Sequence, residues 1–303
     1  MKSKNIILTD GGLETDLIFN HQIELPHFAA FPLLENPKHE KIVRAYYKEY
    51  LEIAKKHNSS FILESATYRA SKDWGFKLGY SEIELDYINR KAIKLLFQLK
   101  KEYQSHLHTI LVSGCIGPRG DGYNVDEIIS VNESENYHTA QIKSFANANA
   151  DLVSAFTMNS CNEALGIVKA AKKNNIDVVI SFTVELDGKL PSGESLEDCI
   201  SKIDETTDSY VKYYMINCAY PTHFIDVLKT NKPWKNRIQG IRANASCKSH
   251  AELDESTELD TGDKNELGNL HQELTNLLPS LQVFGGCCGT DATHIESIYN
   301  CIN

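Results

Sequence analysis

The sequence predicts an α/β protein, an eight-stranded parallel (β/α) barrel of the TIM type that occupies residues 1–303 as a single domain. Short apolar or β-branched runs recur along the chain, and between them apolar residues stand three and four positions apart, as on one face of a helix. Alternation of strand and helix indicates a parallel sheet with covered faces. Eight such units in 303 residues match this barrel in strand number and size. A doubly wound open sheet is the alternative.

The predicted strands follow one another along the whole chain. They are Ile6–Gly11, Ser60–Ser65, Thr109–Gly117, Asp151–Met158, Asp177–Glu185, Tyr213–Cys218, Ile238–Asn244 and Leu281–Cys288. Helices are predicted between them, for example over Pro37–His57 and Glu82–Tyr103, where charged residues separate the apolar ones. The polar, acidic stretch 246–269 is expected to cap the barrel mouth before a helix around Glu266–Leu278.

The composition excludes several classes of function. The formal net charge is −10 and no long basic run occurs, which argues against a nucleic acid or an acidic membrane as partner. No apolar stretch is long enough to span a bilayer, and Met1–Asn5 lack the apolar core of a signal peptide. The eight cysteines do not form the framework of a small secreted domain and fit a reducing compartment. We therefore expect a soluble, cytoplasmic protein that acts on small molecules, with the oligomeric state left open.

Three cysteines form a candidate metal site. Cys287 and Cys288 are adjacent and flanked by glycines, and Cys218 ends a separate apolar run. Neighbouring side chains on a strand point to opposite faces, so the pair can bind one ion only where the backbone turns, which glycine permits. Zinc favours thiolates, and a catalytic zinc site keeps one position open. The residues alone also allow ordinary buried thiols, or a strained disulfide between the adjacent pair. The other cysteines have no partner at metal-like spacing and are expected to be ordinary thiols: Cys115, Cys161, Cys199, Cys247 and Cys301.

The barrel prediction brings these cysteines to one face with other polar residues, because active sites of such barrels lie at the C-terminal ends of the strands. The residues expected there include Asp10, Gly11, Gly12, Glu64, Thr67, Thr157, Glu185, Asn217, Cys218, Arg242, Asn244, Cys287 and Cys288. The three candidate ligands fall at the ends of the sixth and eighth strands. The cysteine pattern and the predicted barrel topology therefore indicate the same site.

At these residues the sequence resembles the homocysteine S-methyltransferase family, which includes betaine- and S-methylmethionine-dependent enzymes and the homocysteine module of cobalamin-dependent methionine synthase. The likeness runs from Ile7 to about Ile298. It is carried by the motifs Thr9-Asp10-Gly11-Gly12, Gly114-Cys115-Ile116-Gly117-Pro118, Asn217-Cys218 and Gly285-Gly286-Cys287-Cys288-Gly289. The resemblance implies that Cys218, Cys287 and Cys288 bind Zn²⁺, and that the substrate is a thiol, homocysteine, which is methylated to methionine. A free thiol has a pKa of about 8.5, and coordination to zinc would deprotonate it.

The resemblance also suggests how the amino acid part of the substrate is bound. Asp10 is the candidate for the ammonium group, with capping of the following turn as the structural alternative. The amides of Gly11 and Gly12 are candidates for the carboxylate, or else form only a tight turn. At the end of the fourth strand the family carries a glutamate for the amino group, and this chain has Phe156. A phenyl ring cannot accept a hydrogen bond from an ammonium group.

Other carboxylates at strand ends are expected to replace that glutamate. Glu64 and Glu185 are the candidates, unless they pair with Arg69 or Arg242 instead, and Thr67 is a further candidate contact. Arg69 also argues against betaine as the methyl donor, because it stands where a betaine enzyme is expected to present an aromatic ring to the quaternary ammonium.

A sulfonium donor, S-methylmethionine or S-adenosylmethionine, is therefore expected by analogy with the family. The chain has no GxGxxG fingerprint for a doubly wound nucleotide site, and its length leaves no room for a cobalamin module. Phe156 keeps open a non-catalytic or differently specific zinc–thiol-binding barrel. A zinc hydrolase is a more distant alternative, since three thiolates make a bound water less acidic than three histidines would.

Overall fold

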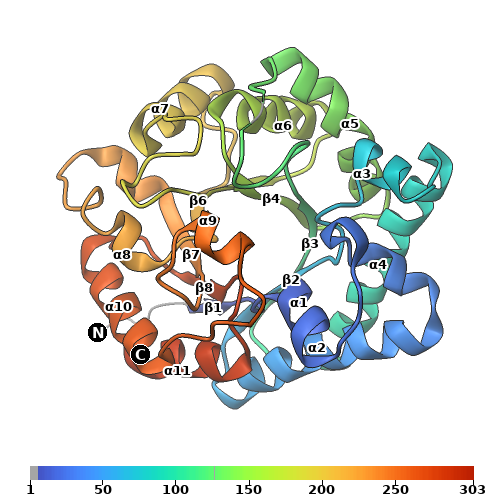
Figure 1. Ribbon diagram of the computed structural model, residues 1–303, viewed down its shortest axis with the longest axis horizontal. Helices are drawn as coiled ribbons and strands as arrows, with labels where there is room; N and C mark the ends of the chain where they lie inside the picture. The colour runs from blue at the N-terminus through green and yellow to red at the C-terminus, as the bar shows by residue number, and fades with distance from the viewer. Residues whose placement is uncertain (1–5, 126) are drawn as a thin grey trace.

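The computed structural model describes residues 6–125 and 127–303, which form a closed barrel of parallel strands (Figure 1). Neighbours in sequence are neighbours in the sheet, and β1 pairs with β8 to close it. The strands are β1 Ile7–Leu8, β2 Ser60–Glu64, β3 Ile110–Ile116, β4 Leu152–Met158, β5 Val178–Phe182, β6 Tyr214–Asn217, β7 Ile238–Ala243 and β8 Val283–Gly286. The predicted barrel is confirmed, and its closure excludes the open sheet. The expectation made for Met1–Asn5 lies outside the described residues.

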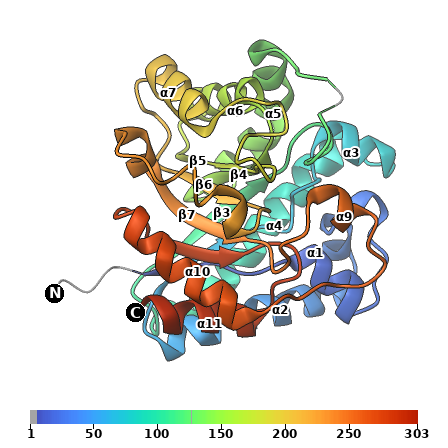
Figure 2. The same ribbon diagram turned by 60° about the vertical axis from the view of Figure 1, so that its left-hand side comes forward.

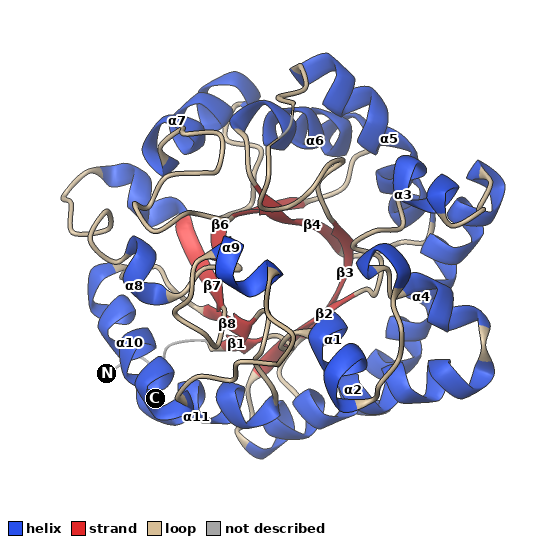
Figure 3. Ribbon diagram, in the orientation of Figure 1, coloured by secondary structure: helices blue, strands red, loops and turns tan. Residues whose placement is uncertain are grey.

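Helices surround the strands as an outer ring (Figure 3). The α-helices are α1 Leu13–Thr15, α2 Pro37–Lys56, α3 Lys72–Lys77, α4 Glu82–Tyr103, α5 Val131–Asn147, α6 Cys161–Lys173, α7 Leu196–Thr207, α8 Pro221–Phe224, α9 His250–Asp254, α10 Lys264–Leu277 and α11 Ala292–Ile302. Shorter 3₁₀ or π turns are η1 Asp16–Asn20, η2 Pro26–Phe28, η3 Phe31–Glu35 and η4 Pro233–Arg237. None of the helices in the described part of the chain has the length and apolar character that a membrane span requires.

Local sequence signals explain where the long helices begin. Helix α4 has the predicted bounds and starts at a capping box, in which Ser81 and Glu84 satisfy each other's backbone N–H groups. Helix α2 starts at Pro37, and the Asn36 side chain accepts a hydrogen bond from the amide of Lys38. Each of these helices buries one apolar face against the barrel.

Two apolar cores hold the barrel together. The larger lies between the outer faces of the strands and the helices. The smaller fills the barrel interior and consists of Ile62, Cys115, Leu152, Phe156, Val179, Tyr213, Met215 and Val283. The interior is therefore packed rather than hollow, which leaves only the mouth of the barrel for a ligand.

Apart from the fourth, which ends at Met158 as predicted, the predicted strands run past the observed ones at the mouth, and the backbone turns there in an unusual way. Thr157 lies where β4 shifts register against β5, and its φ is 58°. Cys218 directly follows β6 with a φ of 53°. A non-glycine residue in this left-handed region costs on the order of 1–3 kcal/mol, so surrounding contacts must hold it. Both residues border the site described below.

A roof covers the mouth of the barrel. Helix α9 lies across the centre of the ring (Figure 1), and the turned view places it above the strand ends (Figure 2). It belongs to the segment 246–263, which we call the roof segment. This position agrees with the expectation that the acidic stretch caps the mouth, and α10 begins at Lys264, two residues before the predicted helix.

Candidate functional site

A cavity of about 430 Å³ lies beneath the roof, at the C-terminal ends of the strands. Its wall includes most of the site residues expected from the sequence, namely Asp10, Gly11, Gly12, Glu64, Cys218, Cys287 and Cys288. Thr67 and Glu185, which were also expected to contact the substrate, do not line it. The cavity brings together residues from both ends of the chain at one point.

The three cysteines meet on one side of this cavity. Their Sγ atoms all lie within 4.8 Å of one another. Cys218 and Cys287 are joined as a disulfide, with their Cα atoms 5.4 Å apart, so the adjacent pair considered above is not the one that is bonded. In the reduced state the cluster offers three sulfur ligands, which suits zinc, and a fourth position remains for a substrate atom. The residues present therefore fit the expected metal.

Asn217 holds the elements that carry two of these cysteines. Its Oδ1 accepts hydrogen bonds from the Thr157 amide at 2.8 Å and from Ser181 Oγ at 2.7 Å. Its Nδ2 donates to Thr157 Oγ1 at 2.9 Å and lies 3.8 Å from Cys287 Sγ. One buried amide thus links β4, β5 and β6 to the cysteine loop after β8. This explains structurally why an asparagine precedes Cys218.

The glycines around the cysteine pair are required mainly by space. A Cβ at Gly285 would overlap Thr9 Oγ1, and one at Gly286 would overlap Thr290 Oγ1. Gly289 supplies the turn itself, since its φ is 78°. Strand β1 approaches from the other side, where a Cβ at Gly12 would come within 2.6 Å of the Cys287 carbonyl oxygen. The expected glycine-dependent turn is present, and β8 ends before the cysteines.

Gly11 and Gly12 also have backbone partners within the protein. The Gly12 amide donates to the Thr290 carbonyl at 3.2 Å, and the Gly11 carbonyl accepts from Arg242 Nη2 at 3.0 Å. The two glycines therefore join the β1 turn to the cysteine loop. Their expected contact with a substrate carboxylate stays a prediction.

Asp10 is buried and paired with Arg242. Its Oδ1 lies 2.8 Å from Arg242 Nη1, and its Oδ2 accepts from Tyr46 at 3.2 Å. Burial raises the pKa of Asp10, and the guanidinium works against that rise. Burial also opposes the charged form of Arg242, but the carboxylates of Asp10 and Glu64 outweigh it, so the pKa of Arg242 is raised. The guanidinium lies 4.8 Å from the centre of the Phe156 ring, at the position of the expected glutamate.

Glu64 belongs to the cavity wall, and one of its carboxylate oxygens is unsatisfied. Its Oε1 accepts from Ser154 Oγ at 3.0 Å, and its Oε2 is buried without a hydrogen-bond partner among the described residues. Burial raises the pKa of Glu64 to about 7, although Arg242 opposes the shift. A second carboxyl group in the wall, Glu14, also has its pKa raised to about 7, first by burial and then by the charge of Asp10. Neither carboxylate forms an ion pair in the described structure with Arg69 or Arg242.

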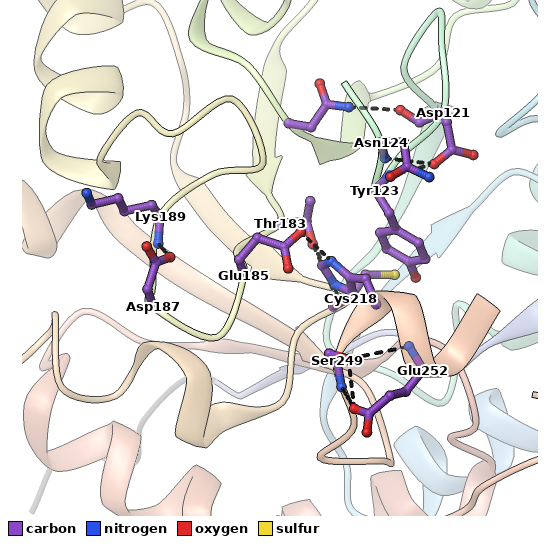
Figure 4. Close-up of polar contacts among 12 residues, drawn as sticks. Asp121, Tyr123, Asn124, Thr183, Glu185, Asp187, Lys189, Cys218, Ser249 and Glu252 are labelled. Atoms are coloured by element: carbon purple, nitrogen blue, oxygen red, sulfur yellow. Dashed lines mark hydrogen bonds and ion pairs between the residues drawn. The ribbon is translucent and has the colours of Figure 1, made fainter. Parts of the chain in front are cut away.

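Thr67 and Glu185 have structural partners. Thr67 is fully buried, shares a hydrogen bond with Ser65 Oγ at 2.6 Å and donates to the Cys115 carbonyl at 2.8 Å. Glu185 lies 3.1 Å from Nδ1 of His250, a roof residue, rather than pairing with an arginine. Figure 4 shows Glu185 and Thr183 close to Cys218, with Tyr123 on the other side.

Arg69, which was expected to lie near the methyl donor, forms part of the cavity wall. Its guanidinium stacks 4.0 Å from the Trp74 ring centre and 5.0 Å from that of Tyr68. It donates to the Gly120 carbonyl at 2.7 Å and lies 3.9 Å from Asp121. The positive charge is thus partly balanced, and the aromatic rings nearby are occupied by this arginine.

Three site residues were not singled out from the sequence: Glu14, Tyr123 and His250. Tyr123 Oη lies 3.8 Å from Cys288 Sγ, and the Tyr123 ring stacks on that of His250 with centroids 3.9 Å apart. Glu14 stands just after the Asp10-Gly11-Gly12 motif, and this position is the signal that could have identified it as a site residue. Tyr123 lies in a loop and His250 begins the short helix α9, and no pattern in the sequence indicates either residue.

Two of the other cysteines lie close together in the structure. Cys161 and Cys199, expected to be ordinary thiols without a partner at metal-like spacing in the sequence, form with Glu194 a group whose ligand atoms lie within 4.8 Å of one another. Both thiols are buried where the amino-terminal ends of α6 and α7 meet. Glu194 accepts the Cys161 amide at 2.8 Å and so satisfies the start of α6. These residues lie outside the cavity wall.

Known proteins of the same overall shape were found among solved structures. The chain superposes on the homocysteine methyltransferase MmuM from Escherichia coli in its oxidized form with a TM-score of 0.79 and 20% identity, over 98% of this chain and 96% of that one. The metallated form of the same enzyme gives a TM-score of 0.76 and 19% identity over the same shares of the two chains. These likenesses support the barrel fold.

Sequence comparisons identify the family. Homocysteine S-methyltransferase 1 from Arabidopsis thaliana is 24% identical over 321 aligned positions, which cover 96% of this chain and 91% of that protein. The family model for homocysteine S-methyltransferase matches residues 7–302, nearly the whole chain. With the three cysteines gathered at the barrel mouth, this match leads to one conclusion: the chain belongs to the homocysteine S-methyltransferase family.

Proposed function

We propose that this protein transfers a methyl group from a sulfonium donor to the thiol of homocysteine, giving methionine, with Cys218, Cys287 and Cys288 as ligands of a zinc ion. The observation that carries the proposal is the convergence of three sulfur atoms within 4.8 Å of one another at a cavity whose wall also includes Glu64, which has a buried oxygen without a hydrogen-bond partner among the described residues. Family membership supports the reaction class. The metallated form of the Escherichia coli relative supports a metal, and the sulfur ligands favour zinc.

In this reaction the thiol loses its proton, its sulfur forms a bond to the methyl carbon, and the bond from that carbon to the sulfonium sulfur breaks. The leaving group departs as a neutral thioether. Zinc held by the three cysteines would lower the pKa of the bound thiol and keep its sulfur nucleophilic. The protein's remaining task is to orient the two substrates, because the donor is already activated.

Glu64 is the residue that we propose binds the ammonium group of homocysteine. It is buried in the cavity wall, and its Oε2 has no hydrogen-bond partner among the described residues. A substrate ammonium would satisfy that oxygen and offset the cost of burying a carboxylate. Asp10 is less available because Arg242 already pairs with it, so we propose for Asp10 a secondary role. Glu64 thus takes the part that Phe156 cannot play.

The charges around the cavity support a cationic donor. Asp10, Glu14 and Glu64 line the wall together with the sulfur cluster, against the two cations Arg69 and Arg242. Arg69 is partly balanced by Asp121 and by backbone carbonyls. A sulfonium such as S-methylmethionine or S-adenosylmethionine would therefore enter a region of negative potential. Since the ligand thiols must be reduced, we propose that the protein works in the cytoplasm.

Metal analysis under reducing conditions tests the site. We expect about one zinc per chain, lost when Cys218 is replaced by alanine. A panel of sulfonium donors with homocysteine then identifies the donor by methionine formation. Zinc binding without product from any donor would favour the non-catalytic, thiol-binding alternative. Absence of zinc from the reduced protein would contradict the proposal as a whole.

An acceptor that lacks the amino group tests Glu64 separately. We expect Glu64→Gln to lower kcat/KM for homocysteine by about tenfold to a hundredfold, the range expected when a charged hydrogen bond worth roughly 1.5–3 kcal/mol is lost. The same substitution should leave kcat/KM for 4-mercaptobutanoate almost unchanged. Equal losses for both thiols would show that Glu64 does not read the ammonium group.

A further inference from the structure

A side chain of the roof segment contacts the backbone of Cys218, one of the proposed metal ligands. His250, the first residue of α9, is buried, and its Nε2 lies 2.7 Å from the carbonyl oxygen of Cys218. A carbonyl oxygen only accepts hydrogen bonds, so Nε2 carries the proton in this contact. The roof is therefore joined directly to a residue that we assign as a metal ligand.

That carbonyl belongs to a residue in a strained conformation. Cys218 has a φ of 53°, which a side chain-bearing residue rarely adopts without support. Besides His250, its carbonyl oxygen accepts from Asn244 Nδ2 at 3.1 Å and from Thr183 Oγ1 at 3.4 Å. Asn244 and Thr183 come from the barrel, so His250 is the donor that the roof adds.

The imidazole ring of His250 is fixed from two sides. Glu185 Oε1 lies 3.1 Å from Nδ1 and sets the rotation of the ring. The Tyr123 ring stacks against it at 3.9 Å with an angle of 14° between the planes. Figure 4 shows Glu185 and Tyr123 on opposite sides of Cys218, together with the Ser249–Glu252 pair that caps the start of α9. Such an arrangement is typical of a side chain that holds another group in place.

We propose that His250 is a positioning residue, through which the roof segment supports the metal-binding conformation of Cys218. The hydrogen bond from Nε2 holds the Cys218 peptide so that its Sγ faces Cys287 and Cys288. Without that hydrogen bond the support is lost and the metal becomes easier to remove. The inference rests on the proposed zinc site, but not on the identity of the methyl donor.

Two substitutions distinguish the roles of the two ring nitrogens of His250. The amide nitrogen of Gln can replace Nε2, so His250→Gln keeps a donor for the Cys218 carbonyl. Asn places its amide nearer the position of Nδ1, so His250→Asn keeps only the contact with Glu185. Ser249→Ala is the matched control: it weakens the cap of α9 but leaves His250 in place.

The readout is the rate at which a chelator removes zinc from the reduced, zinc-loaded full-length protein, together with the charge-transfer spectrum of the cobalt-substituted protein. We expect His250→Asn to lose zinc about tenfold to a hundredfold faster and to alter the cobalt spectrum, because partners of ligand groups contribute in this range. His250→Gln should stay within about threefold of the wild type, and so should Ser249→Ala.

Three outcomes would overturn the inference. In one, His250→Asn loses zinc at the wild-type rate with an unchanged cobalt spectrum. In another, Ser249→Ala accelerates zinc loss as much as His250→Asn, which would assign the effect to the helix rather than to the hydrogen bond. In the third, Gln and Asn behave alike. A wild-type protein that binds no metal would instead contradict the proposed function, so the two failures are distinguishable.

Discussion

Arg242 Nη1 lies 2.8 Å from Asp10 Oδ1, and both side chains are buried at the mouth of the barrel. The same guanidinium donates to the carbonyls of Gly11 and Gly286 and lies over the Phe156 ring. Arg242, in β7, therefore joins the turn after β1 to β8 in the wall of the cavity. Arg242 also pairs with Asp10, the carboxylate that the family resemblance assigns to the substrate ammonium group. Glu64 is therefore the more available carboxylate.

Removing one member of this buried pair should be costly for stability. We expect Arg242→Met to lower the free energy of unfolding by about 3–5 kcal/mol, because it leaves Asp10 buried and without its counter-charge. Urea denaturation measures this change. The double variant Arg242→Met with Asp10→Asn should recover part of the loss, since neither charge then remains. A double variant less stable by the full sum of the two single losses would show that the pair does not interact.

The pKa of Glu64, raised to about 7 by burial, predicts a pH dependence of activity. Only the carboxylate can bind an ammonium group strongly, so kcat/KM for homocysteine should rise as the pH increases through about 7. Glu14 has its pKa near the same value, and Glu14→Gln should therefore keep the rise if Glu64 is responsible. The profile of Glu64→Gln should lack it. A Glu64→Gln profile identical in shape to the wild type would contradict this assignment.

The same shift predicts the opposite trend for stability. A carboxyl group whose pKa is raised on folding stabilises the fold below its unfolded pKa of 4.5, and this contribution is lost as the pH rises through about 7. Glu64→Gln, which stays neutral, should therefore raise the free energy of unfolding at pH 8 by about 1–3 kcal/mol. At pH 5 the change should be small. Lower activity combined with higher stability at pH 8 would be typical of a functional, poorly solvated carboxylate.

Close packing around the cysteine loop gives a further prediction. Gly286→Ala would place a Cβ on Thr290 Oγ1 and should destabilise the protein by about 1–3 kcal/mol, as overpacking does. Gly120→Ala is the control, because a Cβ there would meet no atom within 4 Å. Thermal denaturation of both variants compares them directly. Equal melting temperatures would show that the loop can move aside.

The sequence predicted the scaffold and the sulfur cluster because both depend on local or strongly specified patterns. Alternation of strands and helices sets the barrel, and the glycine-flanked cysteine pair can meet Cys218, at another strand end, only at its mouth. Most strands were predicted too long there because buried residues continue past the strand ends: Ile6–Gly11 was expected where β1 is Ile7–Leu8, and residues 9–11 are buried outside the strand.

Side-chain partners across the roof could not be predicted. Glu185 was expected at the substrate, but its partner His250 begins helix α9, 65 residues later. Cys161 and Cys199 are 38 residues apart and meet only because α6 packs on α7. Such contacts depend on tertiary packing, which no periodicity in the sequence records.

Transfer of a labelled methyl group tests the central claim most directly. Reduced, zinc-loaded protein is incubated with homocysteine and S-methylmethionine or S-adenosylmethionine carrying a deuterated methyl group, and methionine is analysed by mass spectrometry. We predict labelled methionine with at least one donor, its loss after treatment with a chelator, and its return when zinc is added. No labelled methionine from the zinc-loaded protein with either donor, or undiminished transfer by the metal-free protein, would contradict the account.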